Sequence, residues 1–303
     1  MNEISKEIFE KYQVRKTRAQ KTEFIDYIKQ KFPEAKVEEG GFGKNRNIVI
    51  GDVDSAKAVF TAHYDTCARL PFTNFITPKN FLIYILYSIL IAIPFIALMP
   101  ISEIILMVIT KNFLVSYFGS LFITFGTMIY VLMLGKPNPN TANDNTSGVL
   151  ALCELMASLS EEEKAKCAFV FFDNEENGLL GSSFFASLHK KEMKDTLLIN
   201  LDCVGEGDNM MFVISKKAEV YREKLTAAFA GKETKNALFE KASSAFYPSD
   251  QANFKTSVAV AALKKKPVIG YYMDKIHTKK DTVCEEENLS FLCEGFSEFT
   301  KAL

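Results

Sequence analysis

The chain has almost no net charge, and this absence excludes one class of partner. Its 303 residues include 36 lysines and arginines against 37 aspartates and glutamates, which leaves a formal net charge of −1. Proteins that bind nucleic acid through its phosphate backbone normally carry a clear excess of positive charge on the binding domain. We therefore expect no nucleic-acid partner.

The cysteines lack the spacings that mark disulfide scaffolds and thiolate metal sites. There are six, with no CxxC pair among them. No secretory signal peptide is visible in residues 1–32, which are charged and amphipathic. Such cysteines are typical of reduced thiols in a reducing compartment. This composition favours a cytoplasmic location for the soluble part of the protein.

Histidine is also scarce, since the chain contains only His63, His189 and His277. His63 ends an apolar run and has Asp65 two residues further on, and His277 follows another apolar run. A carboxylate close to a histidine can hold its second ring nitrogen, as at many metal-ligating histidines. His189 lies near the end of a predicted helix, where a cation is favourable and a structural role is the simpler interpretation.

Acidic residues follow other apolar runs in the same way. Glu175 and Glu176 come after one run, Asp202 after another, and Asp144 lies in a polar turn that opens an amphipathic helix. Adjacent carboxylates repel one another unless a cation lies between them. Histidine and carboxylate ligands without cysteine suit a catalytic zinc ion. Two metal ions about 3.5–4 Å apart need a bridging ligand, and Asp144 lies midway along the chain between the others.

Apolar runs alternate with amphipathic segments along most of the chain. Strands are predicted near residues 47–50, 58–62, 168–172, 197–201, 211–214 and 267–272, and helices near residues 21–32, 147–158, 179–190, 218–230 and 288–302. This alternation is typical of α/β proteins, with a mostly parallel mixed sheet and helices on both faces. In open α/β sheets ligands bind beyond the carboxyl ends of the strands, which is where the acidic residues and histidines are expected to meet.

Together these motifs resemble those of the co-catalytic zinc aminopeptidases, a family of zinc exopeptidases that includes bacterial leucyl aminopeptidases and the glutaminyl cyclases. The matching segments are His63-Tyr64-Asp65, Asn143-Asp144-Asn145 with Ser147-Gly148, residues 173–182, residues 200–205 and residues 277–282. A weaker match is Ser249-Asp250 with Phe254. The resemblance covers residues 45–77 and 137–303.

The resemblance implies a role for each matched residue. One zinc ion would be held by His63, Asp144 and Asp202, and a second by Asp144, Glu176 and His277. Glu175 would be the general base, which takes a proton from the zinc-activated water and passes it to the leaving amine. Asp65 would orient His63.

The sequence departs from this family in the segment that lines the substrate pocket. The family often has a tyrosine there that hydrogen-bonds the tetrahedral intermediate, whereas Phe246 stands at the aligned position with Tyr247 beside it. Tyr247, Ser249 and Asp250 are therefore the candidates for contacts to the substrate or the oxyanion. Glutaminyl cyclases generally place tryptophans around the pocket, and this sequence has none, so that branch of the family is less favoured.

An apolar insertion, residues 78–136, separates His63 from Asp144. Residues 81–100 and 113–134 contain no charged residue, and each segment has twelve Leu, Ile, Phe or Val residues. A transmembrane helix needs about 20 mostly apolar residues, and twelve such side chains at mid-membrane contribute about −4 to −7 kcal/mol. We interpret the insertion as a transmembrane helical hairpin. A soluble lid or an oligomerisation arm is the alternative, although a partner would then have to cover the apolar surface.

The catalytic domain, residues 1–77 and 137–303, closes around the insertion, so both ends of the hairpin must lie on one side of the membrane. Lys79 and Lys136 flank the hairpin on that side, and Lys111 alone lies in the connecting loop. The positive-inside rule then places the catalytic domain in the cytoplasm, and we expect the plasma membrane to hold the hairpin.

The sequence as a whole predicts a membrane-anchored dizinc aminopeptidase that removes N-terminal residues from peptides. Its expected partners are peptide substrates and the lipid bilayer, which residues 81–134 would contact. One alternative is a glutaminyl cyclase-like enzyme or a hydrolase of non-peptide amides on the same scaffold. Another is a non-catalytic membrane scaffold protein, and the complete set of metal ligands argues against it.

Overall fold

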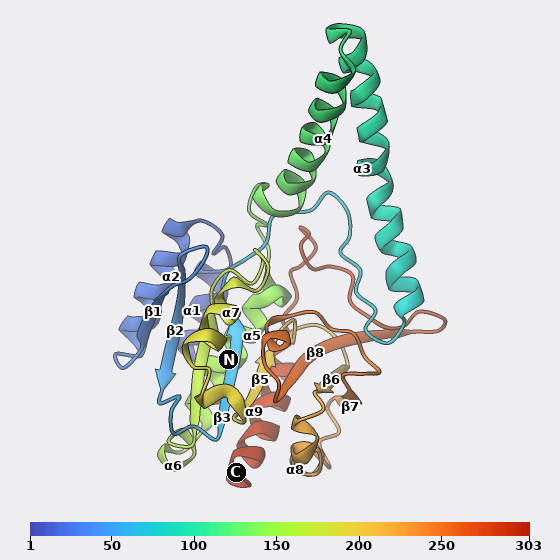
Figure 1. The fold of residues 1–303 in the computed structure, drawn as a ribbon. Coiled ribbons are helices and arrows are strands. Elements are labelled where there is room, and N and C mark those ends of the chain that lie inside the picture. Colours follow the sequence, from blue (N-terminus) through green and yellow to red (C-terminus); the bar gives the residue numbers. More distant parts are fainter.

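A nine-stranded mixed sheet forms the centre of the protein in the computed structural model, which describes all 303 residues (Figure 1). The strands lie in the order β1-β2-β4-β3-β5-β8-β6-β7, and β9 pairs with β8 beside this path. They are β1 (Lys36–Gly40), β2 (Asn45–Gly51), β3 (Ala58–His63), β4 (Cys167–Phe172), β5 (Leu197–Leu201), β6 (Asn209–Ile214), β7 (Asn236–Lys241), β8 (Ser257–Lys266) and β9 (Gly270–Tyr272).

The middle of the sheet is parallel and buried. β4, β3, β5 and β8 lie side by side and run in one direction, and β3, β4 and β5 are buried along their whole length. Near-continuous apolar runs are typical of strands that are covered on both faces. Antiparallel partners flank this centre, because β2 pairs with β4 and β6 pairs with β8 in the opposite direction. The central strands are therefore the parallel ones, and their carboxyl ends lie at the same edge of the sheet.

Helices cover both faces of the sheet. They are α1 (Glu3–Lys11), α2 (Arg18–Lys31), α5 (Gly148–Ser158), α6 (Glu161–Lys164), α7 (Leu180–Leu188), α8 (Arg222–Phe229) and α9 (Glu286–Lys301). α1, α2, α5, α8 and α9 enclose the larger apolar core, to which they contribute side chains such as Phe24 and Phe296. α7 covers the opposite face and packs through Phe185. This arrangement agrees with the predicted fold class.

Three strands lie outside the sequence predictions. β1 and β7 are edge strands whose side chains are mostly half-exposed, so their polar residues obscure the alternation that identifies a strand. β8 is rich in alanine, which has little preference for strands. The strand predicted at residues 267–272 is wrong in its first half, because Val268 has a φ of 70° in the turn that joins β8 to β9.

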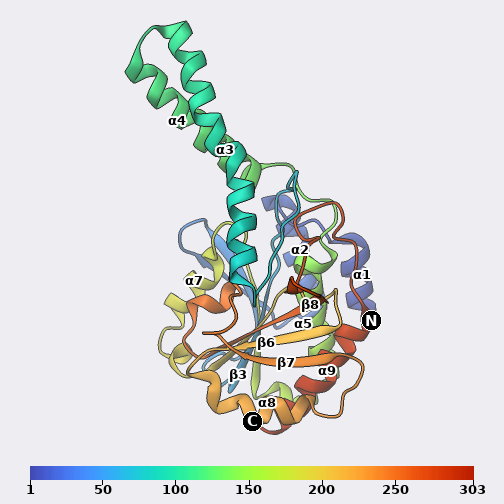
Figure 2. The ribbon, with the colours of Figure 1, turned by 90° about the vertical axis from the view of Figure 1, so that its right-hand side faces the viewer.

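The insertion forms two long antiparallel helices that project away from the sheet (Figures 1 and 2). They are α3 (Phe81–Thr110) and α4 (Phe113–Ile129), and α4 continues as a π-helical turn, η1 (Tyr130–Leu134). The buried residues of the pair are Ser102 on α3 and Ser116 and Ser120 on α4. Small residues at a helix contact let two apolar helices approach closely. The two helices therefore hold one another through small side chains.

Apolar side chains on α3 and α4 are exposed rather than packed in a core. In the most apolar stretch of α3 no residue is buried, and in that of α4 and η1 only 6% are. By length and composition, both helices are able to cross a membrane. The two helices project from the end of the sheet at which β3 ends (Figure 1). The start of α3 and the end of η1 both lie beside the sheet, and the turn between α3 and α4 lies at the far tip (Figure 1).

A buried ion pair joins α2 to the loop that follows β4. The Nζ atom of Lys21 lies 2.6 Å from Oδ1 of Asp173, and it also donates to Oδ1 of Asn174 at 2.7 Å. The side chains of Lys21 and Asp173 are 8% and 3% exposed. Oδ2 of Asp173 accepts the backbone N–H of Arg46, so both carboxylate oxygens have donors. This pair fixes the start of the loop that carries Glu175 and Glu176.

We expect Lys21→Met to lower the free energy of unfolding by about 3–5 kcal/mol, because the change leaves the Asp173 carboxylate buried without its cation. Denaturant titration would measure it. Lys31→Met is the matched control on the same helix, since the pair of Lys31 with Glu7 is one-third exposed and should contribute at most about 1 kcal/mol. Equal effects of the two changes would contradict a buried ion pair of this strength.

Candidate functional site

The five predicted metal ligands come together at the carboxyl ends of the central strands. His63 ends β3, Glu176 lies in the loop after β4, and Asp202 directly follows β5. These three strands are parallel neighbours, so their ends meet at one edge of the sheet. Asp144 arrives from the turn before α5, and His277 from the loop after β9.

These residues line a cavity of about 200 Å³. The remainder of its wall is formed by Asn74, Ile76, Tyr84, Glu175, Cys203, Tyr247, Pro248 and Ile276. All five predicted ligands and the predicted base therefore share one small space. The third histidine is elsewhere: Nε2 of His189 pairs with Oε1 of Glu38 at 2.9 Å, in keeping with a structural role.

Asp144 lies between the two histidines of the cavity. Its Oδ1 is 3.4 Å from Nε2 of His63, and its Oδ2 is 2.9 Å from Nε2 of His277. Nε2 of His63 is also 3.5 Å from Oδ1 of Asp202. Nε2 of His277 is 3.4 Å from Oε2 of Glu176. The geometry is that of two groups, each of one histidine and two carboxylates, that share Asp144.

The side chains in these groups fit a metal ion better than they fit one another. Oε1 of Glu176 and Oδ1 of Asp202 are buried without a hydrogen-bond donor, which is unfavourable for carboxylate oxygens. Potential ligand atoms of His63, Asp144 and Glu176 all lie within 4.8 Å of one another. Imidazole nitrogens and carboxylate oxygens in this arrangement are the ligands of catalytic zinc.

The electrostatics of the cluster also favour a bound cation. Burial raises the pKa of Glu175 well above its usual range and that of Glu176 to about 8. Burial alone would lower the pKa of His277, but the neighbouring carboxylates of Glu176 and Asp144 raise it to about 9. Protons on Glu175, Glu176 and His277 thus offset the negative charge of the crowded carboxylates, as a bound cation would. Because metal ligands must be deprotonated, metal binding here is expected to release protons.

Asp65 connects His63 to the glutamate pair. Its carboxylate accepts the backbone N–H groups of Glu175 at 2.9 Å and Glu176 at 3.2 Å. Nδ1 of His63 lies 3.1 Å from the backbone oxygen of Asp65 and 3.6 Å from its Oδ1. The backbone carbonyl is therefore the nearer partner of the ring, and the carboxylate mainly fixes the loop that carries the glutamates.

Asp281 holds the segment around Asp144, and sequence reasoning gave it no role. Its two carboxylate oxygens accept the backbone N–H groups of Asn143 at 2.7 Å and Asp144 at 3.0 Å. In the sequence it is marked only by its position four residues after His277, within the matched segment of residues 277–282. Gly148, after this segment, approaches β5 so closely that an added Cβ would lie 2.3 Å from the carbonyl oxygen of Leu201.

Arg15 is a second residue that sequence reasoning missed. It is fully buried, its Nε donates to the carbonyl of Tyr64, and its Nη1 donates to Oγ1 of Thr146 at 3.2 Å. Burial lowers its pKa to about 10, so it stays charged at neutral pH. Arg15 therefore places a positive charge behind the segments that carry His63 and Asp144. No local pattern in the sequence marks a partner so distant along the chain.

The predicted substrate-contacting residues divide into two groups. Tyr247 lines the cavity, but its hydroxyl donates to the backbone carbonyl of Asp202 at 3.0 Å. Ser249 and Asp250 are fully buried and do not line the cavity. Oγ of Ser249 accepts a hydrogen bond from the amide of Asn200 at 3.0 Å. The structure thus gives the Tyr247 hydroxyl an internal partner and places the other two behind the wall.

We expect Tyr247→Phe to lower the free energy of unfolding by about 1–3 kcal/mol, because the carbonyl of Asp202 loses its donor. The change in kcat should be far smaller than the about 10²–10³-fold that loss of an oxyanion contact produces. Denaturant titration and steady-state kinetics on the zinc-loaded variant would measure the two effects. A fall in kcat of that size without a change in stability would instead assign the hydroxyl to the oxyanion.

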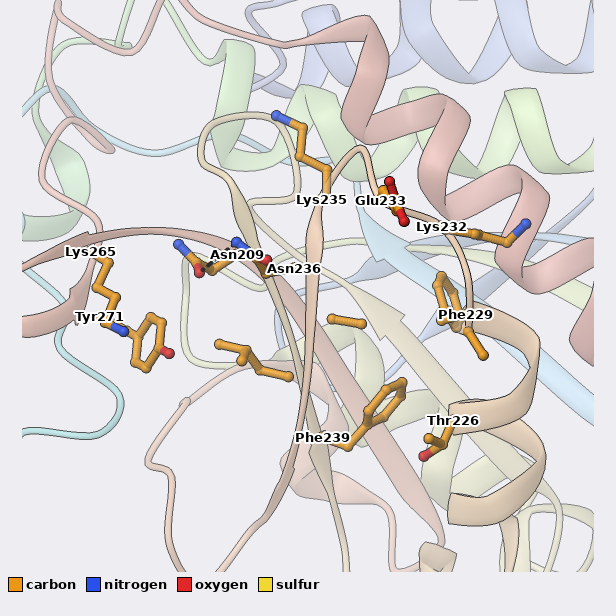
Figure 3. A pocket seen from close by; sticks show the side chains of 13 residues that line it. Asn209, Thr226, Phe229, Lys232, Glu233, Lys235, Asn236, Phe239, Lys265 and Tyr271 are labelled. Atoms are coloured by element: carbon orange, nitrogen blue, oxygen red, sulfur yellow. Dashed lines mark hydrogen bonds between the residues drawn. The ribbon is translucent and has the colours of Figure 1, made fainter.

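A larger cavity, of about 720 Å³, lies between β7 and α8 (Figure 3). Thr226 and Phe229 of α8 stand on one side of it, and Lys265 and Tyr271 stand apart on the other (Figure 3). The cationic head of Lys235 is already paired with Glu285. No histidine lines this cavity and Glu233 is its one carboxylate, so it lacks the cluster of possible metal ligands that the smaller one has.

Comparisons with known proteins give the family and the fold of the chain. The sequence model of peptidase family M28 matches residues 127–291, and no curated protein matches in sequence. The fold is similar to that of the LapA aminopeptidase of Legionella pneumophila, with 14% identity, a TM-score of 0.58, and coverage of 98% of this chain and 68% of that one.

Two further solved structures match the chain over most of both lengths. One is a Zn-dependent exopeptidase from Parabacteroides distasonis, with 17% identity, a TM-score of 0.57, and coverage of 98% of this chain and 94% of that one. The other is an Acidobacteriales bacterium glutaminyl cyclase, with 13% identity, a TM-score of 0.58, and coverage of 99% and 92%. At such identities the likeness is one of fold.

Proposed function

The chain belongs to peptidase family M28, whose model matches more than half of it, and on that premise we propose that it is a membrane-anchored dizinc aminopeptidase. The observation that carries the proposal is the shared position of Asp144, with one carboxylate oxygen at His63 and the other at His277. A carboxylate so placed is suited to bridge two metal ions. Structural neighbours described as an aminopeptidase and an exopeptidase support the reaction class.

In this proposal each metal ion has three ligands from the chain. His63, Asp144 and Asp202 would hold one zinc ion, and Asp144, Glu176 and His277 would hold the other. When bound, zinc polarises the scissile carbonyl and lowers the pKa of water towards about 7. Asp281 and Asn145 keep the segment of Asp144 in place, since the Asn145 amide donates to the carbonyl of Leu201 at 3.0 Å.

Glu175 is the proposed general base. A proton of the attacking water moves to its carboxylate as the new C–O bond forms, and the same proton is then delivered to the amine nitrogen as the C–N bond breaks. Potential ligand atoms of Glu175, His63 and Asp202 lie within 4.8 Å of one another. Asp65 holds the backbone of Glu175, so the base is fixed relative to the groups that would bind metal.

The size of the cavity supports action at a chain end. Its volume of about 200 Å³ is below the about 300–1,000 Å³ that is usual for drug-sized ligands. It therefore suits one terminal residue with its scissile bond rather than the middle of an extended chain. Removal of N-terminal residues from peptides is the reaction we propose.

The proposed anchor is the hairpin of α3 and α4. α3 has 30 residues and the continuous helix of α4 and η1 has 22, which at 1.5 Å per residue gives about 45 Å and about 33 Å. Both exceed the about 30 Å of a bilayer's apolar core. Lys79 and Lys136 lie at the domain end of the hairpin, which favours a cytoplasmic catalytic domain at the plasma membrane.

Metal analysis combined with a substrate panel tests this function. We expect the full-length protein, purified in detergent, to bind two zinc ions and to hydrolyse aminoacyl-nitroanilides, whereas N-acetylated analogues should resist. A chelator should abolish hydrolysis, and added zinc should restore it. Absence of both zinc and hydrolysis would overturn the proposal, and one zinc ion per active chain would overturn its dizinc form.

A second candidate, a glutaminyl cyclase-like enzyme, is favoured by one fold neighbour of that description. Incubation with a peptide that begins with glutamine separates the two. Release of free glutamine is expected from an aminopeptidase, and loss of ammonia with the chain length unchanged is expected from a cyclase. Mass spectrometry distinguishes these products directly.

A further inference from the structure

The hairpin contributes part of the wall of the active-site cavity. Tyr84, on the first turn of α3, lines the cavity together with His63 and Glu175. Ile83 and Tyr87 on the same face of α3 are half-buried, whereas Leu82, Ile85 and Leu86 on the other faces of its first turns are exposed. The helix that is proposed to enter the membrane therefore begins as a component of the site.

Aromatic contacts fix this part of α3 to the catalytic domain. The ring of Phe246, which is 44% exposed, lies 5.4 Å from that of Tyr84 and 6.1 Å from that of Phe81. Phe75 packs against Tyr87 at 5.4 Å. Aromatic pairs at these separations are attractive beyond the area that they bury. The position of Tyr84 in the wall is thus held from both sides.

Exposed apolar side chains begin on the same turn of α3 that carries the cavity-lining Tyr84. Leu82, two residues before Tyr84, is 67% exposed, and the two lie only about 3 Å apart along the helix axis. Val268, at the tip of the β8–β9 turn, is 92% exposed. The carbonyl of Val268 accepts a hydrogen bond from the side chain of Asn80, the residue that precedes α3. Exposed apolar side chains therefore lie at the base of α3, next to the cavity.

We propose that the substrates are polypeptides anchored in the same bilayer, and that Tyr84 is a specificity-determining residue that contacts them from the membrane side. The inference rests on the proposed function. A cavity bounded by α3 opens at the level of the lipid headgroups. The N-terminus of an anchored chain is already at that level, and its effective concentration there is much higher than that of a peptide in solution.

Matched substrates in vesicles test the substrate class. The zinc-loaded full-length protein is reconstituted in phosphatidylcholine vesicles with three peptides that share one N-terminal sequence. One is soluble, one carries a transmembrane anchor after a spacer of about 5 residues, which reaches at most about 18 Å, and one carries it after a flexible spacer of about 30 residues. We expect both anchored peptides to be cleaved about tenfold or more faster than the soluble one at equal bulk concentration.

The short spacer decides where the cavity opens. A cavity remote from the bilayer would be reached only through the long spacer, so cleavage of that peptide alone overturns the inference. Equal cleavage of the soluble and anchored peptides overturns it as well, while leaving the aminopeptidase intact. No cleavage of any of the three by the zinc-loaded protein removes the proposed function itself, together with the inference.

Substitution of Tyr84 tests the residue. We expect Tyr84→Ala to lower kcat/KM for the short-spacer peptide by about tenfold, mainly through KM, with zinc content unchanged, and Tyr84→Phe to retain the ring and most of the activity. Tyr130→Ala is the matched control, because Tyr130 lies on the hairpin, is exposed and does not line the cavity. An unchanged KM in Tyr84→Ala, or an equal effect of Tyr130→Ala, overturns the role of Tyr84.

Discussion

Glu175→Gln should lower kcat by about 10²–10⁴-fold and leave the zinc content unchanged. Glutamine has the shape of glutamate but cannot accept a proton from the attacking water. Glu175 is not needed for either group of metal ligands, because each has one histidine and two other carboxylates. The measurement is kcat for an aminoacyl-nitroanilide, with zinc determined on the same sample.

Glu176→Gln is the matched control for this experiment, since the two glutamates are neighbours in one loop. It replaces a proposed ligand, so we expect zinc to fall together with activity. Full activity in Glu175→Gln would remove Glu175 from the role of base. Loss of zinc in that variant, to the same extent as in Glu176→Gln, would make Glu175 a ligand instead.

Asp144→Asn should weaken both metal sites at once. The asparagine amide has one oxygen where the carboxylate has two, so it cannot be a ligand on the His63 side and on the His277 side at the same time. We expect most of the zinc to be lost on dialysis, and affinity to fall by more than the about 10–100-fold that is typical when an outer partner of a ligand is removed. Zinc per chain, measured by mass spectrometry at known protein concentration, provides the readout.

Asp202→Asn is the comparison for Asp144→Asn. Asp202 contacts only the His63 side, so this change should reduce the zinc content from two ions to one. Retention of two zinc ions in Asp144→Asn would contradict a bridging role. Equal losses in the two variants would show that the sites do not bind independently.

The ends of the central strands could be predicted from the sequence because each is marked locally. His63, Glu176 and Asp202 directly follow apolar runs, and parallel neighbours bring such positions together. The family and the fold class are confirmed by the comparisons. The dependence on zinc, the number of zinc ions and the role of each site residue stay predictions, although the structure places these residues in one cavity.

Residues that act across long distances could not be predicted. Arg15 reaches Thr146, and Asp281 reaches the backbone of Asp144, and neither contact has a periodic pattern that a reader of the sequence could use. Tyr84 was hidden for a different reason. It lies in an apolar run, where a residue that lines a cavity looks the same as one that faces lipid.

α3 extends beyond the uncharged segment for a physical reason. The uncharged segment ends at residue 100, but the helix continues to Thr110, because Glu103 is a good helix former and does not interrupt the backbone pattern. Pro94 and Pro100 also lie inside the helix. Proline is tolerated in long apolar helices when neighbouring groups satisfy the freed carbonyls.

The place of the hairpin in the chain order has a consequence for biosynthesis. Of the five proposed ligands, only His63 precedes α3, and Asp144, Glu176, Asp202 and His277 all follow α4. A chain is synthesised from its N-terminus, and its segments become available in that order. The hairpin therefore emerges from the ribosome before four of the five ligands emerge, so a nascent chain that inserts it during synthesis reaches the bilayer before it can hold zinc. Such a peptidase would be confined to the membrane before it becomes active.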